Sequence, residues 1–282
     1  MADAAFQTQY RNQFIRGFEQ YQSLLREFVT TEGQSKGNQF IFLVADSGDA
    51  EAVTRGVNGR IPGRPDNLTQ LTCTLQEWHD RPEKTGFNIF ASQSDGKQIM
   101  QVTSMGVMNR KIDQLIINEL DTGSVGAGDT PATATAAWLL KAKTRLQNAK
   151  VPWDGNITAL ISPAAEAYLM QVKEFANAQY VNSKPFGDAG PAWADKPGYY
   201  KWLGMNIVTH PSLPGVGTSD ETCYMFHRSA IGHAADVKNI QTFVGYDEKD
   251  DFSYCRVTCY MGSKLLQNSG VVVLPHDGSA MA

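Results

Sequence analysis

The chain has 282 residues, 42% of them hydrophobic, which excludes a wholly disordered protein and is enough for one large or two ordinary domains with a substantial core. Its net charge is −4 and it has no run of lysine or arginine, so no specific nucleic-acid site is expected. Charged residues make up 19%, below the roughly 25% of an average soluble domain, which is typical of a surface that partners partly cover.

The sequence predicts neither a signal peptide nor a membrane span. The N-terminus "MADAAFQTQYRNQF" lacks an apolar core segment, and no stretch reaches the roughly 18 apolar residues that a membrane helix needs. In such an apparently cytoplasmic chain, the four cysteines are expected to be free thiols.

The first segment carries an apolar stripe at helical spacing. Its members recur at steps of three or four residues: Phe6, Tyr10, Phe14, Phe18, Tyr21, Leu25 and Phe28. This spacing predicts an amphipathic helix. Because one of its faces is apolar, the helix must lie on the chain's own core or on a neighbouring subunit.

Two strand-like runs, Gln39–Val44 and Leu71–Gln76, flank a long segment without a helical or strand period. Residues 45–70 hold glycines, prolines, three arginines and four acids. A loop this long is uncommon in a compact domain unless it is functional or reaches outward. A two-stranded ribbon is marginally stable alone in water, so we expect a long hairpin arm that rests on another surface.

The strongest helical pattern of the chain runs from Gly96 to Asp121. Its apolar positions keep a period of 3.6 residues: Ile99, Val102, Met105, Met108, Ile112, Leu115, Ile116 and Leu120. The small-residue stretch "DTGSVGAGDTPATATA" that follows marks a hinge and a domain boundary.

Helices and strands alternate after this hinge. A helix is predicted over residues 136–149 and a buried strand over Ile157–Ile161. Ser162 and Pro163 are an N-cap and a first-turn proline, which open a helix over residues 164–176. Further strands are predicted in "LGMNIVTHPSLPG" and in "CYMFHRSAIGHA", the latter turning at Gly232.

The tail is expected to form two strands around a turn at Gln267–Gly270. In the first of these strands, Cys255, Val257, Cys259 and Met261 share one face. The chain is therefore predicted to have a mixed α/β fold, classed as α+β, without a regular βαβ repeat.

Few residues suggest chemistry. His227 and His233 in "MFHRSAIGHAAD" would lie about 20 Å apart on a straight strand, with no acid at ligand spacing. Cys255 and Cys259 would lie about 13 Å apart, too far for a disulfide or for one zinc ion. We expect no catalytic residue, no metal site and no cofactor. The enzyme hypothesis that stays open is a metal-dependent hydrolase that uses His210, His227 and His233.

The order of these parts resembles the major capsid proteins of tailed bacteriophages, which have the Hong Kong 97 type of fold. "NRKIDQLIINEL" (109–120) is similar to the end of that family's spine helix, and "ITALISPAAEAYLMQVKEFANAQYV" (157–181) to a strand and helix of its axial domain. "YYKWLGMNIVTHPSLPG" (199–215) and "MFHRSAIGHA" (225–234) resemble the next strands, and "SYCRVTCYMGSKLLQNSGVVVL" (253–274) the closing strands of the peripheral domain. The resemblance covers almost the whole chain.

The resemblance implies a Hong Kong 97-like fold with four parts. These are an N-terminal arm, residues 1–37; an extended hairpin loop, 38–85; a peripheral domain with the spine helix, 86–122 and 238–282; and an axial domain, 123–237.

The function it implies is self-assembly into the hexamers and pentamers of an icosahedral head, the virion capsid, which encloses double-stranded DNA without specific contacts. Other copies of the chain are the main partners, together with scaffolding, portal and cement proteins; assembly in the host cytoplasm is expected, without a membrane. An encapsulin-like bacterial compartment shell with the same fold is the alternative.

Contacts between subunits are expected from the arm and the N-terminal stripe. The candidates are Arg55, Arg60, Arg64, Asp46 and Asp49 of the arm, and Phe14, Phe18 and Tyr21 of the stripe. Exposed ion pairs contribute only about 0–1 kcal/mol each, so apolar burial must carry most of the cohesion. The tip of the hairpin arm has arginines and no lysine, so the lysine–asparagine crosslink of some family members is not expected.

Overall fold

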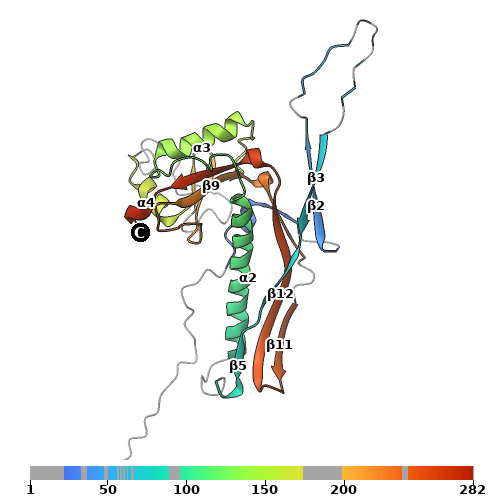
Figure 1. Cartoon of the computed structure of the whole chain (residues 1–282), viewed down its shortest axis with the longest axis vertical. Helices are drawn as coiled ribbons and strands as arrows, with labels where there is room; N and C mark the ends of the chain where they lie inside the picture. Colours follow the sequence, from blue (N-terminus) through green and yellow to red (C-terminus); the bar gives the residue numbers. More distant parts are fainter. Residues whose placement is uncertain are drawn as a thin grey trace, which may run out of the picture.

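The structure is a computed structural model that describes residues 22–32, 37–47, 50–55, 57, 59, 61, 63–64, 67–88, 96–173, 199–236 and 241–281. Two sheets and one long helix make up an elongated body, and a two-stranded ribbon projects from it (Figure 1). None of the helices in these ranges is long and apolar enough to cross a bilayer.

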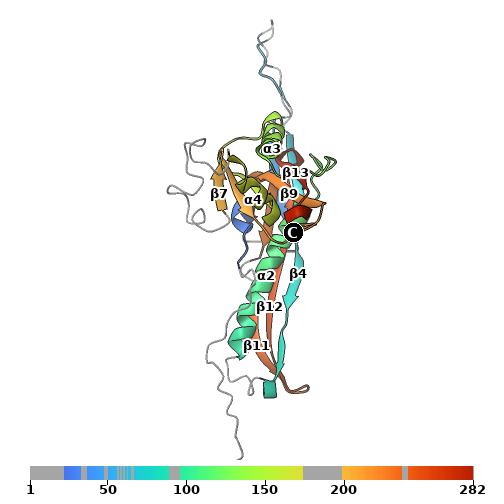
Figure 2. The same ribbon diagram turned by 90° about the vertical axis from the view of Figure 1, so that its left-hand side faces the viewer.

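The long helix α2, Gly96–Leu120, confirms the strongest helical prediction. Its 25 residues correspond to a length of about 37 Å. The helix lies along the 14-residue strand β12, Phe252–Leu265 (Figures 1 and 2). The face of β12 that was predicted to be apolar is buried, and its members are Cys255, Val257, Cys259 and Met261.

One position of the predicted helical stripe is wrong: Met105 is 60% exposed. One row of buried residues on α2 recurs at steps of four, at Met100, Ser104, Met108, Ile112, Ile116 and Leu120, and Gly106, Asp113 and Ile117 are buried beside it. A row of this spacing is inclined to the helix axis. The buried row therefore turns gradually around α2 from its start to its end, and Met105 lies off this row.

A six-stranded sheet is built around β12. On one edge β12 pairs with β10, Ile231–Ala235, and with β11, Gln241–Asp247. On its other edge it pairs with β4, Gln76–Asp80, and with β5, Glu83–Thr85. These pairings are all antiparallel, and β1, Thr30–Glu32, joins β10 in parallel. Residues from three distant parts of the chain thus meet on one strand.

A five-stranded sheet has the order β13-β9-β6-β8-β7. Its strands are β13, Val271–His276; β9, Glu221–His227; β6, Ile157–Ile161; β8, Met205–Thr209; and β7, Tyr199–Trp202. Only β6 and β8 run parallel. Every residue of β6 is buried, as predicted for a strand inside a sheet.

Two helices accompany this sheet: α3, Ala136–Asn148, and α4, Pro163–Met170 (Figure 1). The Ser162 hydroxyl accepts a hydrogen bond from the Ala165 amide and Pro163 occupies the first turn, which confirms the predicted start of α4. This helix ends at Met170, earlier than predicted, and residues 174–198 lie outside the described ranges.

The predicted turn at Gly232 is wrong. The chain turns in the 3-10 helix Arg228–Ala230, and Gly232 lies inside β10. A Cβ atom on Gly232 would come within 2.6 Å of Cζ of Phe42, a residue of the ribbon. Glycine is present here because an aromatic ring packs directly on the backbone, and not because the chain bends.

In three of the ranges proposed from the sequence, some strands pair with strands of another range. Residues 76–85, placed in the hairpin, form β4 and β5 of the six-stranded sheet. β10, placed with the axial segment, pairs with β12, while β13, placed with the peripheral segment, pairs with β9 in the five-stranded sheet. The sheet to which a strand belongs is therefore decided by pairing with strands distant in sequence, and not by its neighbours along the chain.

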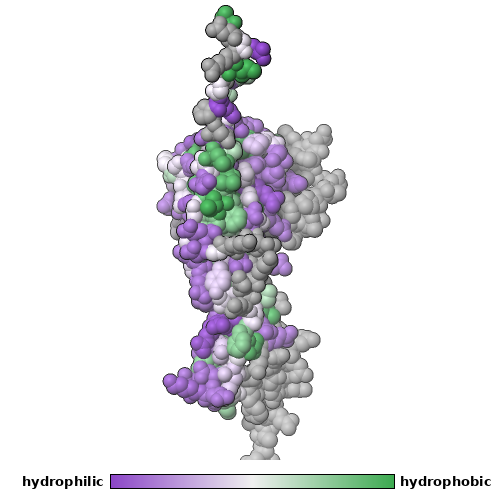
Figure 3. Space-filling model, turned by 90° about the vertical axis from the view of Figure 1, so that its right-hand side faces the viewer, coloured by the Kyte–Doolittle hydropathy of each residue, from purple (hydrophilic) through white to green (hydrophobic). Residues whose placement is uncertain are grey.

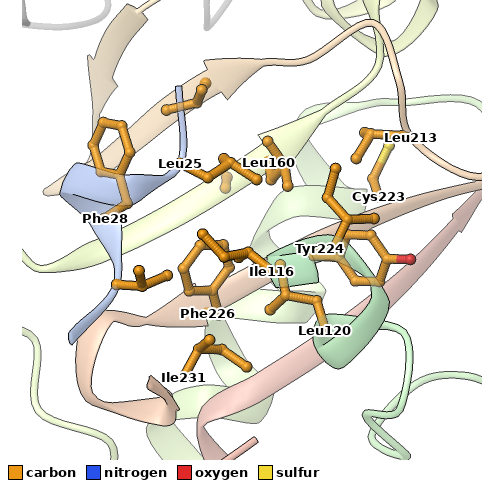
Figure 4. Packing of buried hydrophobic residues seen from close by; sticks show 14 of the residues in the cluster. Leu25, Phe28, Ile116, Leu120, Leu160, Leu213, Cys223, Tyr224, Phe226 and Ile231 are labelled. Atoms are coloured by element: carbon orange, nitrogen blue, oxygen red, sulfur yellow. The ribbon is translucent and has the colours of Figure 1, made fainter. Parts of the chain in front are cut away.

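One continuous hydrophobic core joins the two sheets and α2. In Figure 4, Ile116 and Leu120 of α2 lie in the same cluster as Tyr224 and Phe226 of β9. Leu25 and Phe28, the last two positions of the N-terminal stripe, are also buried in this core. This part of the stripe therefore lies on the chain's own core; Phe6, Tyr10, Phe14, Phe18 and Tyr21 lie outside the described residues.

Candidate interaction surfaces

The three histidines of the hydrolase hypothesis have separate hydrogen-bond partners. His210 Nε2 lies 3.3 Å from Asp113 Oδ2, and His227 Nε2 lies 3.2 Å from Asp154 Oδ1. His233 Nδ1 lies 2.9 Å from Ser263 Oγ, and burial lowers the pKa of His233 to about 4. The structure therefore does not bring these histidines together, because each one contacts a different element: His210 contacts α2, His227 the residues before β6, and His233 the neighbouring strand β12.

Neither the cysteines nor other metal-binding side chains form a cluster in the described residues. Cys73, Cys223, Cys255 and Cys259 are free and buried, and burial raises the pKa of Cys73 to about 11 and of Cys223 to about 12. Thiols with such pKa values are poor nucleophiles and poor metal ligands at neutral pH. Within the same residues, no group of three or more histidines, cysteines or acids could hold a metal ion.

The projecting ribbon confirms the two strands of the predicted arm. Strand β2, Gln39–Asp46, pairs antiparallel with β3, Asn67–Thr74. The ribbon and the described residues between its strands extend beyond the rest of the molecule (Figure 1). We call residues 39–74 the arm.

The base of the arm is anchored on the body by Phe42. Its ring is buried with Cys73 and Ala234 in a small second cluster, directly over Gly232. On the neighbouring strand, a Cβ on Gly262 would lie 2.6 Å from the Thr74 carbonyl oxygen, so β3 also touches the backbone of β12 closely. The arm thus leaves the body from a fixed base.

The opposite face of the arm is apolar and uncovered. The register places Ile41 opposite Thr72 and Ala45 opposite Leu68, with Leu43 between them, so these side chains share one face. Ile41, Leu43 and Leu68 are 50%, 61% and 51% exposed. We call these three residues the outer arm face. Figure 3 shows hydrophobic residues gathered over this ribbon on the right-hand side of Figure 1.

The charged candidates of the arm make contacts within it. Asp46 accepts a hydrogen bond from the Asn67 amide across the two strands, and Arg64 Nη1 donates to the Ser47 carbonyl at 3.3 Å. Arg55 is exposed. Asp49 and Arg60, like Phe14, Phe18 and Tyr21, lie outside the described residues. The five consecutive apolar residues of "QFIFLV" place apolar side chains on both faces of the strand, and this could have pointed to Ile41 and Leu43.

A buried carboxylate that the sequence did not reveal fixes the start of the described chain. Asp113 of α2 is 1% exposed and accepts hydrogen bonds from the Ser23 hydroxyl at 2.5 Å and from the Leu24 amide at 3.0 Å. The Leu25 amide and His210 Nε2 also face it. An acid next to Ile112 inside an apolar helical pattern was the available signal.

A second buried carboxylate, Glu221, ties the five-stranded sheet together. It accepts hydrogen bonds from Ser162 Oγ at 2.6 Å, from the Gly217 amide at 2.7 Å and from His276 Nδ1 at 2.6 Å. Burial alone would raise the pKa of Glu221, but these hydrogen bonds outweigh it and hold the pKa below its usual range. Glu221 thus joins β9, β13 and the start of α4.

Taken together, the described residues present an uncovered apolar arm and no assembled catalytic group, which is an arrangement suited to binding another protein. A family model described as phage capsid protein matches residues 2–277. The chain belongs to the phage capsid protein family. A search of curated proteins finds no significant match.

Solved structures share the fold of this phage capsid protein over nearly its whole length. A chain of Mycobacterium phage Che8 is 19% identical with a TM-score of 0.74, and the match covers 97% of this chain and 98% of that one. The head structure of Helicobacter pylori bacteriophage KHP40 is 12% identical with a TM-score of 0.72, covering 98% and 97%. The capsid of Ralstonia phage GP4 is 11% identical with a TM-score of 0.71, covering 98% and 96%.

These matches confirm the predicted fold class, a mixed α/β fold of the Hong Kong 97 type. The family whose model matches the chain is one of structural proteins of the phage capsid.

Proposed function

We propose that this protein is the major capsid protein of a tailed bacteriophage and that its subunits assemble into the icosahedral shell of the head. The observation that carries the proposal is the arm, whose outer face is left apolar in the single subunit although the chain belongs to a capsid protein family. Fully burying a side chain such as leucine contributes about 1.5–3 kcal/mol, so covering three half-exposed ones contributes about 3 kcal/mol per arm. Because every subunit of a shell would contribute one arm, this free energy would be a substantial part of what holds the shell together.

The candidate contact residues of the arm and the N-terminal segment serve this assembly. Arg55, Arg64 and Asp46 are exposed on the arm and would pair with charged groups of a neighbouring subunit, as would Arg60 and Asp49. Such pairs set the register of the contact more than its strength. The aromatic residues Phe14, Phe18 and Tyr21 supply further apolar area near the start of the chain.

The full assembly would contain hexamers and pentamers in the virion capsid, formed in the host cytoplasm with scaffolding, portal and possible cement proteins. The part of the subunit built on β12 and α2 would be the peripheral domain, and the five-stranded sheet would be the axial domain. Double-stranded DNA would be enclosed without specific contacts, which suits a net charge of −4.

Electron microscopy of the purified full chain, expressed with and without its phage's scaffolding protein, tests the proposal. Closed particles are expected in at least one of the two preparations. A triple variant, Ile41→Ser, Leu43→Ser and Leu68→Ser, is expected to stay folded but to lose the particles. The matched control, Gln70→Ala with Thr72→Ala, changes polar residues of the same face and should still assemble.

A chain that stays monomeric in both preparations would contradict the proposal. Particles that contain an enzyme cargo, with neither portal nor DNA, would support the compartment-shell alternative instead.

A further inference from the structure

A groove with a volume of about 460 Å³ lies between α2 and β4. This volume is within the roughly 300–1,000 Å³ range of sites that enclose a ligand of several groups. Its apolar lining comes from Trp78 of β4 and from Val107, Met108 and Ile117 of α2. The groove is therefore large enough to receive several side chains of a partner.

The permanently charged side chains that line this groove, among the described residues, are both basic. They are Arg110 and Lys111 of α2, and the other titratable groups of the lining are two histidines. Each histidine contacts an acid, Glu77 or Asp113, that does not itself line the groove. An occupant that complements this surface carries apolar side chains with negative charges beside them.

Lys111 is held over the groove by two uncharged groups. Its Nζ lies 3.9 Å from the centre of the Trp78 ring and donates a hydrogen bond to Gln114 Oε1 at 3.0 Å. Neither partner neutralises the ammonium group, and the ring fixes its position by a cation–π contact. The positive charge of Lys111 is thus in place before a partner arrives.

The turn between β11 and β12 has the complementary composition. Residues 247–251, "DEKDD", contain four acids and one lysine, and Glu248, Asp250 and Asp251 are exposed. Tyr246, at the end of β11, is 53% exposed, and its hydroxyl donates a hydrogen bond to Asp251 Oδ1. The turn lies at the lower end of the body in Figure 1 and presents an aromatic ring beside carboxylates.

This turn lies too far from the groove of its own subunit to fill it. At the turn, Phe252 of β12 pairs with Asp247, whereas Cys259 of β12 pairs with Trp78 at the groove. Seven residues of strand separate Phe252 from Cys259, which corresponds to about 23 Å at about 3.3 Å per residue. Because β11 and β5 both pair with the start of β12, the turn is fixed at this distance.

We propose that the groove between α2 and β4 receives the β11–β12 turn of a second copy of the chain. Tyr246 of that copy packs against Trp78, and its carboxylates lie beside Lys111 and Arg110. The inference rests on the proposed function, since copies must associate, and it names a contact between them that does not involve the arm. Because charge pairs contribute to it, raising the salt concentration should weaken this contact.

Photo-crosslinking in particles assembled from heavy-isotope-labelled and unlabelled full-length subunits tests the proposal. Val107→p-benzoylphenylalanine places the reactive group in the groove. Met105→p-benzoylphenylalanine is the matched control, because Met105 is exposed on α2 but does not line the groove. Mass spectrometry is expected to find residues 245–252 attached at position 107 and not at position 105, including pairs of one heavy and one light peptide.

Charge reversal tests the ionic part of the contact. Lys111→Glu alone, or Glu248→Lys with Asp250→Lys alone, should lower the yield of this crosslink about tenfold, and all three changes together should restore it. Restoration separates a lost charge pair from a misfolded subunit. Lys143→Glu is the matched control, because Lys143 also lies over a tryptophan ring, that of Trp153, but does not line the groove, and it should leave the yield unchanged.

Crosslinks at position 107 that omit residues 245–252, or that join peptides of one label only, would overturn the proposal. A yield with Lys111→Glu equal to that with Lys143→Glu would also overturn it. In each of these cases the particles still form, and the proposed function stands. A wild-type chain that forms no particles with scaffolding protein present would overturn both.

Discussion

Replacing Glu221 with alanine is expected to destabilise the subunit by about 4 kcal/mol. The side chain is fully buried, and its carboxylate accepts hydrogen bonds from Ser162, Gly217 and His276. Alanine leaves the buried Ser162 hydroxyl and His276 ring without this acceptor, at a cost of about 1–3 kcal/mol for each group.

Thermal unfolding of the unassembled subunit, followed by circular dichroism, measures this loss. At about 2–4 °C per kcal/mol for a large domain, Glu221→Ala should lower Tm by about 8–16 °C at pH 7. Glu221→Gln keeps the shape and can exchange hydrogen bonds with Ser162 and His276, so it should lose only about 1–2 kcal/mol. Glu248→Ala, an exposed acid in the turn before β12, should change stability by less than about 0.5 kcal/mol.

The dependence on pH gives a second check. Because the pKa of Glu221 is lowered in the folded state, its contribution is fully present above the unfolded value, about 4.3, and is lost as the pH falls through the folded value. The difference between the wild type and Glu221→Ala should therefore be full at pH 7 and shrink below about pH 4. A loss no larger than that of Glu248→Ala, or a difference that is equal at pH 7 and pH 3, would refute the reasoning.

Three other changes have defined outcomes. Phe42→Ala empties the site over Gly232 and should lower the free energy of unfolding in urea by about 3 kcal/mol; an unchanged midpoint would argue against the anchor. Asp129→Asn should destabilise at pH 7, and since hydrogen bonds from Arg145 and Lys141 lower the pKa of Asp129 to about 2, the loss should fade between about pH 4 and pH 2 in thermal scans. Burial lowers the pKa of His233 to about 4, so the unfolded state binds a proton first and the wild type loses stability as the pH falls from 6.5 to 4. His233→Gln should therefore make the free energy of unfolding depend less on pH in this range; a pH profile equal to that of the wild type would contradict this prediction.

Local patterns predicted the elements well. The period of α2, the Ser162–Pro163 start of α4 and the alternating face of β12 are properties of short segments, and the structure confirms each. The prediction for Met105 was wrong because the sequence shows the period of the helix but not how its buried row turns around the axis.

Long-range pairing could not be predicted from those patterns. β13 pairs with β9, and β10 with β12, because register and burial across the whole fold decide which edges meet. Gly232 was predicted to be a turn, because the sequence does not distinguish a glycine that bends the chain from one that is covered by the ring of a residue far away in sequence, here Phe42. Asp113 and Glu221 are two of 29 acids, and only the fold shows that they are buried.

Cryo-electron microscopy of assembled particles tests the central claim most directly. A reconstruction that resolves side chains is expected to show a closed icosahedral shell of this chain in which another subunit covers Ile41, Leu43 and Leu68 of every arm. A shell in which these three side chains remain open to solvent, or a preparation that yields no shell with scaffolding protein present, would contradict the account.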